Sequence, residues 1–390
     1  MFMIYSKVGS TWHQVNVLSA KVGSTWMNMS EGGVRVSGAW HPFFSNVNYA
    51  DRLYAWGRNY SGELGDGTTT NKTSPVKIGT STWKMISCYD QSLGILSDNT
   101  LWGWGTNIWG QVGNGSTLSV YYPKKIGTST WKTIATSRHS LGIRSDDTLW
   151  AWGLNSSGQL GIGSTYNKLS PTQVGTSTWK AIEGNYSHSL GIRSDDTLWA
   201  WGANQYGQLG DGTTVGKLSP VQIGTSTWKA ISGGQYYSLA ILSDNTLWAW
   251  GRNYFGELGD GTTTQRNSPV QIGTSTWKAI ACGTNHSLAI LSDNTLWAWG
   301  LNSSGRLGIG STYNKLSPTQ VGTSTWKAIS GSVHSLGIRS DNTLWAWGAN
   351  QYGQLGIGDT ATRTSPTKVG MATWKVIAAG YFHSLAIRGQ

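Results

Sequence analysis

The sequence predicts an all-β protein whose main part is a seven-bladed β-propeller of four-stranded blades. A Trp-Gly dipeptide recurs at seven positions spaced 48 or 49 residues apart, a period typical of propellers in which one repeat supplies about one blade. The 53 glycines and the 12% of charged residues are typical of a turn-rich β protein, and the 24 tryptophans offer ample apolar surface for a core. The Trp-Gly tryptophans are Trp56, Trp104, Trp152, Trp201, Trp250, Trp299 and Trp347.

Each repeat contains four short apolar segments separated by Gly and Asn. In a typical repeat, strands A, B, C and D are expected at residues 179–182, 189–192, 198–201 and 220–223. Pro220 indicates that strand D is an edge strand, because proline cannot donate to a neighbouring strand. Residues 194–197 predict a tight turn between B and C, with Asp or Asn at two positions of unusual backbone angle. Strand C is apolar on both faces, which indicates that neighbouring blades cover both of its sides.

The half-repeats at the two ends of this region predict how the ring closes. The first C/D pair, residues 53–78, has no A/B pair of its repeat before it, and the last A/B pair, residues 374–388, has no C/D pair after it. We therefore expect the C-terminal strands to pair with the first C/D strands. The two ends would then share one blade and leave no open sheet edge.

Spaced Gly, Trp, Pro and His residues carry a family resemblance. Residues 201–210 read Trp-Gly-x-Asn-x-x-Gly-Gln-Leu-Gly, Pro220 follows, and residues 283–287 read Gly-x-x-His-Ser. This combination resembles the regulator of chromosome condensation repeat family over about 340 residues. The resemblance implies a seven-bladed propeller and no single activity, because the fold hosts exchange factors, a plant ultraviolet photoreceptor and a β-lactamase inhibitor. The repeat spacing leaves no room for a GTPase-binding insertion, and no Trp stands where the photoreceptor holds its chromophore.

The first 48 residues follow a different period. Three units of 14 residues contain Trp12, Trp26 and Trp40, and each reads as two short strands around a turn. We therefore divide the chain into an N-terminal module, residues 1–48, and a propeller, residues 49–390. The module is similar to N-terminal repeats of bacteriophage virion and tail proteins, and its three tryptophans are the expected attachment residues to other structural proteins. The alternative is a decayed propeller repeat.

Six A/B loops end in Ser preceded by His or Tyr, and the seventh has Gln before its Ser. A ring of histidines could hold a metal, but we favour a repeated structural hydrogen bond, because no zinc or calcium spacing is present. No acid is placed beside these His-Ser pairs as a catalytic triad requires. We therefore expect no catalytic residues, no cofactor and no metal. The residues before Ser are Gln91, His139, His188, Tyr237, His286, His334 and His383.

Recognition is expected on the face that carries the A/B and C/D loops. The B/C and D/A connections, on the opposite face, hardly vary between repeats, whereas the A/B and C/D tips vary and are rich in aromatic residues, which suits binding. The alternative is that these tips are unconstrained solvent loops. We expect Trp109 and Tyr254 to be the main anchors. The candidate ligand or partner face comprises Tyr60, Tyr89, Ile108, Trp109, Arg138, Tyr186, Tyr206, Tyr236, Tyr254, Phe255, Tyr352, Tyr381 and Phe382.

Charge, cysteine content and hydropathy limit the partners and locations that the sequence favours. The net charge of +11 favours encounters with polyanions, but a Lys follows the Ser-Thr-Trp tryptophan in each repeat, so the charge is spread around the ring and nucleic acid is not the expected partner. Cys88 and Cys282 stand four repeats apart and are expected to be buried and unbridged. No apolar stretch is long enough to span a membrane, and the first residues lack the pattern of a signal peptide.

Together these observations favour a non-enzymatic binding or structural protein. The leading hypothesis is a phage virion or tail-associated adhesion propeller that recognises a cell-surface glycan or protein through the A/B and C/D loops. The alternative is a soluble regulator or inhibitor that binds a partner protein with the same face. The expected location is the virion, on the phage tail or capsid surface, and otherwise the cytoplasm.

Overall fold

The chain forms two compact units, Met1–Tyr49 and Ala50–Gln390. The computed structural model describes residues 51–389 with their side chains, and in the first unit it describes only the backbone of six short strands. These pair as antiparallel hairpins β1–β2, β3–β4 and β5–β6. The side chains of Trp12, Trp26 and Trp40 lie outside the described part, so their attachment role stays a prediction. The strands are Tyr5–Val8, Thr11–Gln14, Ser19–Val22, Thr25–Ser30, Gly33–Val36 and Ala39–Pro42.

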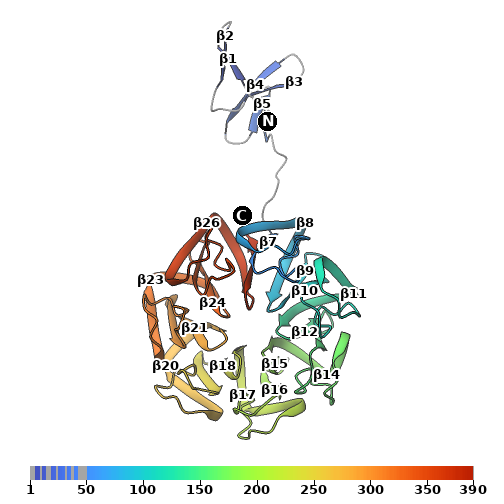
Figure 1. Cartoon of the computed structure of the whole chain (residues 1–390), viewed down its shortest axis with the longest axis vertical. Helices are drawn as coiled ribbons and strands as arrows, with labels where there is room; N and C mark the ends of the chain where they lie inside the picture. Colours follow the sequence, from blue (N-terminus) through green and yellow to red (C-terminus); the bar gives the residue numbers. More distant parts are fainter. Residues whose placement is uncertain are drawn as a thin grey trace. The chain divides into compact units, whose positions relative to one another are not determined.

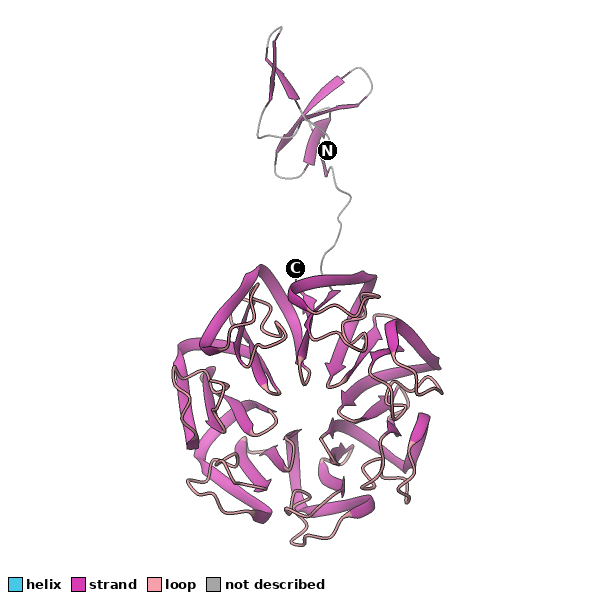
Figure 2. Cartoon of the chain, in the orientation of Figure 1, coloured by secondary structure: helices cyan, strands magenta, loops and turns pink. Residues whose placement is uncertain are grey.

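The second unit is the predicted propeller. Its 21 strands, β7 to β27, form one closed antiparallel sheet around a centre (Figure 1). No helix occurs among residues 51–389 (Figure 2). The inner B strands are β9 (Gln91–Leu96), β12 (His139–Arg144), β15 (His188–Arg193), β18 (Tyr237–Leu242), β21 (His286–Leu291), β24 (His334–Arg339) and β27 (His383–Arg388). The C strands are β7 (Arg52–Gly57), β10 (Thr100–Gly105), β13 (Thr148–Gly153), β16 (Thr197–Gly202), β19 (Thr246–Gly251), β22 (Thr295–Gly300) and β25 (Thr343–Gly348).

Each blade has four strand segments because neighbouring blades share a long strand. The first half of β14 pairs with β13, as in Trp150↔Gln173, and its second half pairs with β15, as in Ile182↔Gly191. The predicted loop between strands D and A is therefore wrong: the chain stays extended and bends at Gly175, whose φ of 60° favours glycine. The seven long strands are β8 (Lys72–Cys88), β11 (Val120–Thr136), β14 (Lys168–Gly184), β17 (Lys217–Gly233), β20 (Arg266–Cys282), β23 (Lys315–Gly331) and β26 (Arg363–Ala379).

The ring closes as the half-repeats predict. Strand β27 pairs antiparallel with β7, with Ser384 opposite Trp56, and β26 pairs with β27 on the other side. The last strands of the propeller, β26 and β27, thus complete one blade with its first strand, β7 (Figure 1). No sheet edge is left open between the first and last repeats.

The B/C turns differ in one respect from the prediction of two residues with unusual backbone angles. In the turn before β10, only Asn99 has a positive φ, 65°. The preceding Asp98 instead accepts hydrogen bonds from the Thr100 backbone N–H, at 2.9 Å, and from its hydroxyl, at 2.7 Å. A carboxylate that caps the turn from its own side chain needs no left-handed backbone.

The core is built on contacts between blades at the Trp-Gly tryptophans, which are fully buried. Trp104 Nε1 donates to the carbonyl of Glu63 in the preceding blade, at 2.9 Å. The Ser92 hydroxyl donates to the same carbonyl, at 2.8 Å. A Cβ on Gly65 would lie 2.8 Å from Trp104 Nε1, so glycine is required there. The same double acceptor recurs in all seven blades, at Glu63, Gln111, Gln159, Gln208, Glu257, Arg306 and Gln354.

The residue before each of these serines extends the contact to the next blade, which confirms the structural interpretation of the histidines. His139 Nε2 lies 2.7 Å from Ser189 Oγ, and His383 Nε2 lies 2.9 Å from Ser92 Oγ. Because each Ser hydroxyl already donates to a backbone carbonyl, the histidine must donate its Nε2–H. Gln91 makes the corresponding contact in its blade, 3.0 Å from the hydroxyl of Ser140. The contacts of the full ring join 91 to 140, 139 to 189, 188 to 238, 237 to 287, 286 to 335, 334 to 384 and 383 to 92. At the Tyr position the direction differs, because Tyr237 Oη donates to the His286 carbonyl and accepts from the Ser287 hydroxyl.

Burial holds these histidines neutral. It lowers the pKa of His139, His188, His334 and His383 to about 3, and the pKa of His286 in the same direction. Their Nδ1 atoms are buried without a hydrogen-bond partner. Protonation there would place an unpaired charge inside the ring.

We predict that the propeller loses stability as pH falls from about 6.5 toward 3. In that interval the unfolded histidines bind protons and the folded ones do not, so each contributes a slope of up to about 1.4 kcal/mol per pH unit. Urea unfolding between pH 4.5 and 7.5 measures the slope. The variant His334→Gln introduces the side chain that Gln91 provides at the equivalent position of another blade, so it should preserve the fold. It should reduce the pH dependence of the unfolding free energy by about one proton. An unchanged slope in this variant would show that the ring is not the acid-sensitive element.

Candidate functional site

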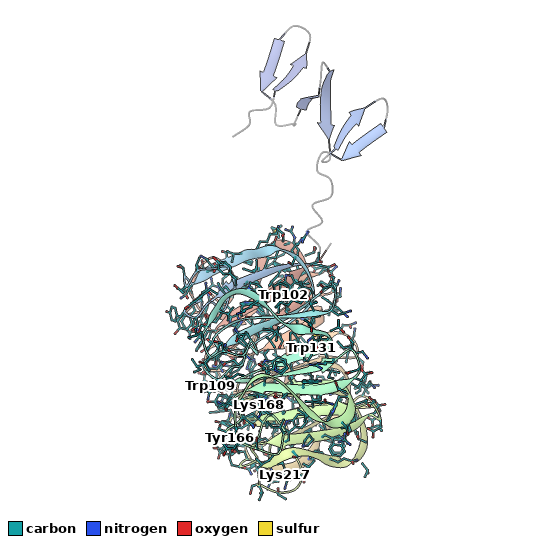
Figure 3. The ribbon with its side chains drawn as sticks, turned by 90° about the vertical axis from the view of Figure 1, so that its right-hand side faces the viewer. Trp102, Trp109, Trp131, Tyr166, Lys168 and Lys217 are labelled. Carbon is teal, nitrogen blue, oxygen red and sulfur yellow. The ribbon has the colours of Figure 1, made fainter. Side chains whose placement is uncertain are left out.

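The variable A/B and C/D loops meet on one face of the propeller, as predicted. Arg138, in an A/B loop, lies with its guanidinium carbon 5.5 Å from the ring centre of Trp109, in a C/D loop. The rings of Tyr236 and Tyr206, again one from each kind of loop, are 5.0 Å apart. Figure 3 shows the propeller from the side, with Trp109 and Tyr166 of two C/D loops toward the same edge. We call this surface the loop face.

Five predicted residues form one cluster of stacked rings on the loop face, which we call the Tyr60 cluster. The ring centres of Tyr60 and Tyr352 are 5.8 Å apart, and those of Tyr352 and Phe382 are 5.0 Å apart. Tyr381 continues the chain, 4.4 Å from Phe382 and 5.3 Å from Tyr89. The cluster therefore joins loops from both sides of the blade that closes the ring.

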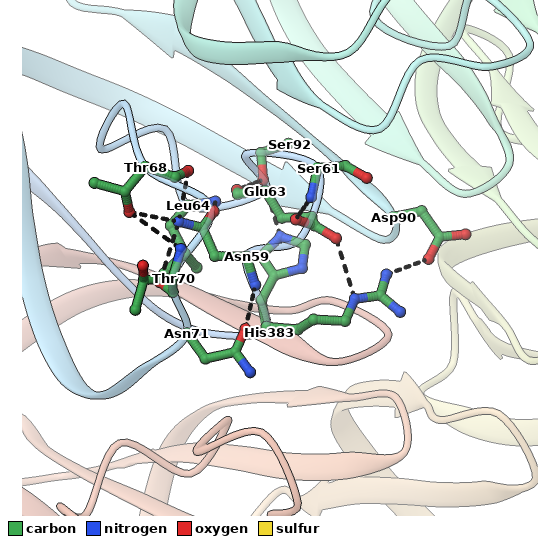
Figure 4. A network of polar contacts seen from close by, with 11 residues as sticks. Asn59, Ser61, Glu63, Leu64, Thr68, Thr70, Asn71, Asp90, Ser92 and His383 are labelled. Carbon is green, nitrogen blue, oxygen red and sulfur yellow. Dashed lines mark hydrogen bonds and ion pairs between the residues drawn. The ribbon is translucent and has the colours of Figure 1, made fainter.

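Arg58 holds this cluster in place through contacts with two carboxylates and one ring. Arg58 Nε lies 3.1 Å from Glu63 and its Nη2 lies 3.2 Å from Asp90 (Figure 4). Its guanidinium also lies 4.9 Å from the ring centre of Phe382. Burial raises the pKa of Asp90, and the charges of Arg58 and Arg138 oppose that rise. Ion pairs of this kind hold the loops in one arrangement before any ligand arrives.

A second cluster covers the neighbouring blades, and we call it the Tyr206 cluster. Its members are linked in order by ring contacts of 5.0 to 5.9 Å between Tyr186, Tyr236, Tyr206 and Tyr254. Arg138 lies 3.9 Å above Tyr186 at one end. At the other end Arg252 pairs with Glu257 at 2.9 Å and lies near the Phe255 ring. The members are Trp109, Arg138, Tyr186, Tyr206, Tyr236, Tyr254 and Phe255.

The structure thus places every predicted face residue except Ile108 in one of the two clusters. Ile108 is exposed and has no ring contact. Tyr254 is exposed, whereas Trp109 is half-buried beneath Arg138. Most of the rings are half-buried against one another, so they are not free solvent loops.

Sequence reasoning missed the charged residues that organise the face. Arg58 and Arg252 each precede a Glu by five residues, and the five other repeats have no Arg at the first of these positions and no Glu at the second. Comparison of the repeats with one another would have shown this pairing. Asp90 and Asn285, which the two arginines also contact, lie in A/B loops and carry no such signal.

The sixth copy of the Glu or Gln position carries Arg306. In the other six blades the side-chain oxygen accepts the backbone N–H two residues earlier, as Gln159 does from Ser157 at 2.9 Å. A guanidinium has no acceptor for this role. Residues 295–329 otherwise repeat residues 148–182 without a change, so Gln159 and Arg306 are the one difference between two copies.

Arg306 is a buried arginine with no acidic partner among the described residues. It is 8% exposed, takes part in no ion pair, and its Nε has no hydrogen bond. Its Nη2 reaches only the Ser303 hydroxyl, at 3.4 Å. Burial lowers the pKa of the guanidinium, while the Tyr381 and Tyr237 hydroxyls act in the opposite direction. A buried charge without a counter-charge is costly.

The second halves of the seven long strands surround a central cavity of about 350 Å³. One carboxyl group lines it, that of Glu183, at a position where other repeats have Ser or Ala. Burial raises the pKa of Glu183 to about 8, opposed by hydrogen bonds from Gly233 and Ser232. Cys88 and Cys282 also line the cavity, and both are buried and free, as predicted.

The described residues form neither a metal site nor a membrane-spanning helix. Among them, no group of three or more His, Cys, Asp or Glu side chains is arranged to hold a metal ion. The same part of the chain contains no helix with the length and apolar character needed to cross a bilayer.

The fold and the loop face define a repeat propeller with an invariant frame and a variable aromatic surface. The chain belongs to the RCC1-like domain family, whose model matches residues 28–278. The regulator of chromosome condensation (RCC1) repeat matches residues 277–306, 293–337 and 341–387. No functionally curated protein matches the sequence.

Solved structures show the same fold. Human WBSCR16 is similar with a TM-score of 0.80 and 21% identity, over 87% of this chain and 99% of that one. The structure of Prp20p from Saccharomyces cerevisiae, described with its binding to Gsp1p and histones, has a TM-score of 0.80 and 20% identity, over 87% and 92% of the two chains. Yeast RCC1 (Prp20) with bound Kap60 has a TM-score of 0.79 and 20% identity, over 87% and 89%.

We predict opposite stability effects for a reciprocal pair of substitutions. Arg306→Gln removes an unpaired buried charge and supplies the acceptor that its copy has, so it should raise the free energy of unfolding by about 1 to 3 kcal/mol. Gln159→Arg should lower it by a similar amount. Urea unfolding at pH 7 measures both. Equal effects of the same sign would contradict the assignment of Arg306 as unpaired.

Proposed function

We propose that this protein binds a partner protein through the loop face and that it is not an enzyme. The observation that carries the proposal is the assembly of twelve variable-loop residues, mostly Tyr, into two clusters on a single face. Trp, Tyr and Arg dominate the residues that contribute most to protein interfaces. Tyr also gives a large contact area at low cost in side-chain entropy.

The stacking of the rings supports binding rather than simple exposure. Rings that are half-buried against neighbours and held by Arg58, Arg138 and Arg252 are already ordered in the free protein. A partner that docks on them has less conformational entropy to remove. The opposite face carries nearly identical turns in each repeat and offers no comparable variation.

The arrangement of the His-Ser pairs argues against catalysis. Each Ser hydroxyl donates to a backbone carbonyl, and each histidine is buried and neutral with its Nε2–H directed at a serine. A nucleophile needs a base that can accept its proton and a free path to substrate. These pairs provide neither.

The relatives favour a protein ligand over a glycan. One yeast Prp20 structure has Kap60 bound, and another is described together with the binding of Prp20p to Gsp1p and histones. The family and structure matches lend no support to a phage virion or tail protein, or to glycan adhesion. We therefore favour the alternative of a regulator or inhibitor that binds a partner protein. The attachment role of residues 1–48 and the cellular location stay predictions.

We predict that Trp109→Ala with Tyr254→Ala weakens partner binding at least about 30-fold, because the loss of even one principal interface residue of this type costs about 2 kcal/mol or more. The measurement uses the full chain as bait in an extract of its source cells, followed by titration of the captured species. Met371→Ala, an exposed residue in the bend of β26, is the matched control and should change nothing. Treating the extract with protease should abolish capture. Capture that survives protease but not glycosidase would contradict a protein ligand.

A further inference from the structure

One sector of the loop face lies between the two aromatic clusters, and its C/D loop, residues 301–314, carries Arg306 together with the exposed side chain of Tyr313. The Tyr206 cluster ends at Phe255, and the Tyr60 cluster begins at Tyr352. Between them the C/D loop places the exposed Ser303 and the half-buried Ser304, whereas Ser332 and Val333 of the adjoining A/B loop are buried.

Several polar groups in this sector have no partner within the described protein. Arg306 Nε is buried without a hydrogen bond. The hydroxyls of Ser332 and Thr284, in the A/B loops of two adjacent blades, are also buried without one, and both line the central cavity. The Thr284 backbone N–H donates to the Ser332 carbonyl at 2.9 Å, which links the two loops. Buried polar groups are nearly always satisfied, so a guanidinium that is only 8% exposed and has no acidic partner among the described residues calls for a partner from outside the chain.

The chemistry of the Arg306 guanidinium specifies that partner. All five guanidinium hydrogens are donors, and a carboxylate accepts two of them in a fixed geometry. Arg58 and Arg252, the two other arginines at the base of the loop face, already have their carboxylates in Glu63 and Glu257. The repeat that contains Arg306 has Leu301 at the position of Arg58 and Arg252, and it supplies no acidic residue to pair with Arg306.

We propose that Arg306 forms a carboxylate pocket that receives one Asp or Glu side chain, or the C-terminal carboxylate, of the partner protein. The pocket rests on the proposed function for its occupant, since the flanking aromatic clusters would contact the same partner. Its anion selectivity depends on Arg306 alone. The two copies of the repeat supply the control, because Arg306→Gln recreates the side chain that folds at position 159.

Two pairs of probes test the pocket in the full-length chain. The first pair is a capped Tyr- and Ala-containing hexapeptide with a central Glu and the same peptide with Gln. We expect the Glu peptide to bind the wild type about tenfold more tightly, as one charge-assisted hydrogen-bonded pair provides. Arg306→Gln should bind both peptides alike, and Gln159→Arg should keep the wild-type preference. A Glu preference that persists in Arg306→Gln, or is absent from the wild type, would overturn the pocket.

The second pair is sodium acetate and sodium chloride at equal ionic strength, with thermal unfolding as the readout. Acetate should raise the midpoint of the wild type above its value in chloride, because a ligand that binds only the native state stabilises it, and should leave Arg306→Gln unmoved. No difference between the salts in the wild type contradicts the pocket. If acetate stabilises the wild type while Trp109→Ala with Tyr254→Ala leaves partner capture unchanged, the pocket is supported and the proposed function is rejected. Binding of sialyllactose or inorganic phosphate in place of the Glu peptide, lost in Arg306→Gln, would overturn the protein carboxylate as occupant.

Discussion

The rest of the structure depends on one backbone carbonyl in each repeat. It is the carbonyl of the Glu, Gln or Arg residue that follows the C/D tip, and it accepts both the indole N–H of the next blade's Trp-Gly tryptophan and the hydroxyl of that blade's serine. In six of the seven blades the serine also accepts a hydrogen bond from a His or Gln side chain of the preceding blade, and Ser287 instead contacts the Tyr237 hydroxyl. The shared carbonyl, the indole N–H and the serine hydroxyl therefore join each blade to its neighbour through buried hydrogen bonds. Repeated seven times, the same lock closes the ring.

This lock also explains why recognition is confined to one face. The glycine two residues after the shared carbonyl must lie against the tryptophan, so the lower part of each C/D loop cannot vary. The tip, four to five residues earlier, makes no such contact and is free to change. Variation is thus permitted only where the A/B and C/D tips emerge. Arg306 is an exception. Its backbone carbonyl accepts the same two hydrogen bonds as in the other blades, but its side chain differs from the Glu or Gln found there.

Period, strand order and closure could be predicted from the sequence because each depends on residues that recur. Trp56 and the segment after Trp374 sit at the ends of one pattern, and antiparallel pairing leaves a single way to join them. The continuous strand through Gly175 could not be predicted, because Gly-Thr-Ser-Thr is equally typical of a loop. The aromatic face residues could be recognised by type. Their division into two clusters, and the roles of Asp90 and Arg306, depend on neighbours more than 20 residues away in sequence.

The central claim is that a ring of neutral histidines, each donating Nε2–H to a serine, holds the blades together. Nitrogen-15 NMR of the imidazole rings tests it most directly, since the two nitrogens report protonation and tautomer separately. The account predicts that His139, His188, His286, His334 and His383 show a protonated Nε2 and an unprotonated Nδ1, unchanged between pH 5 and 8. Titration of these five residues near pH 6.5, or a proton on Nδ1, would contradict it.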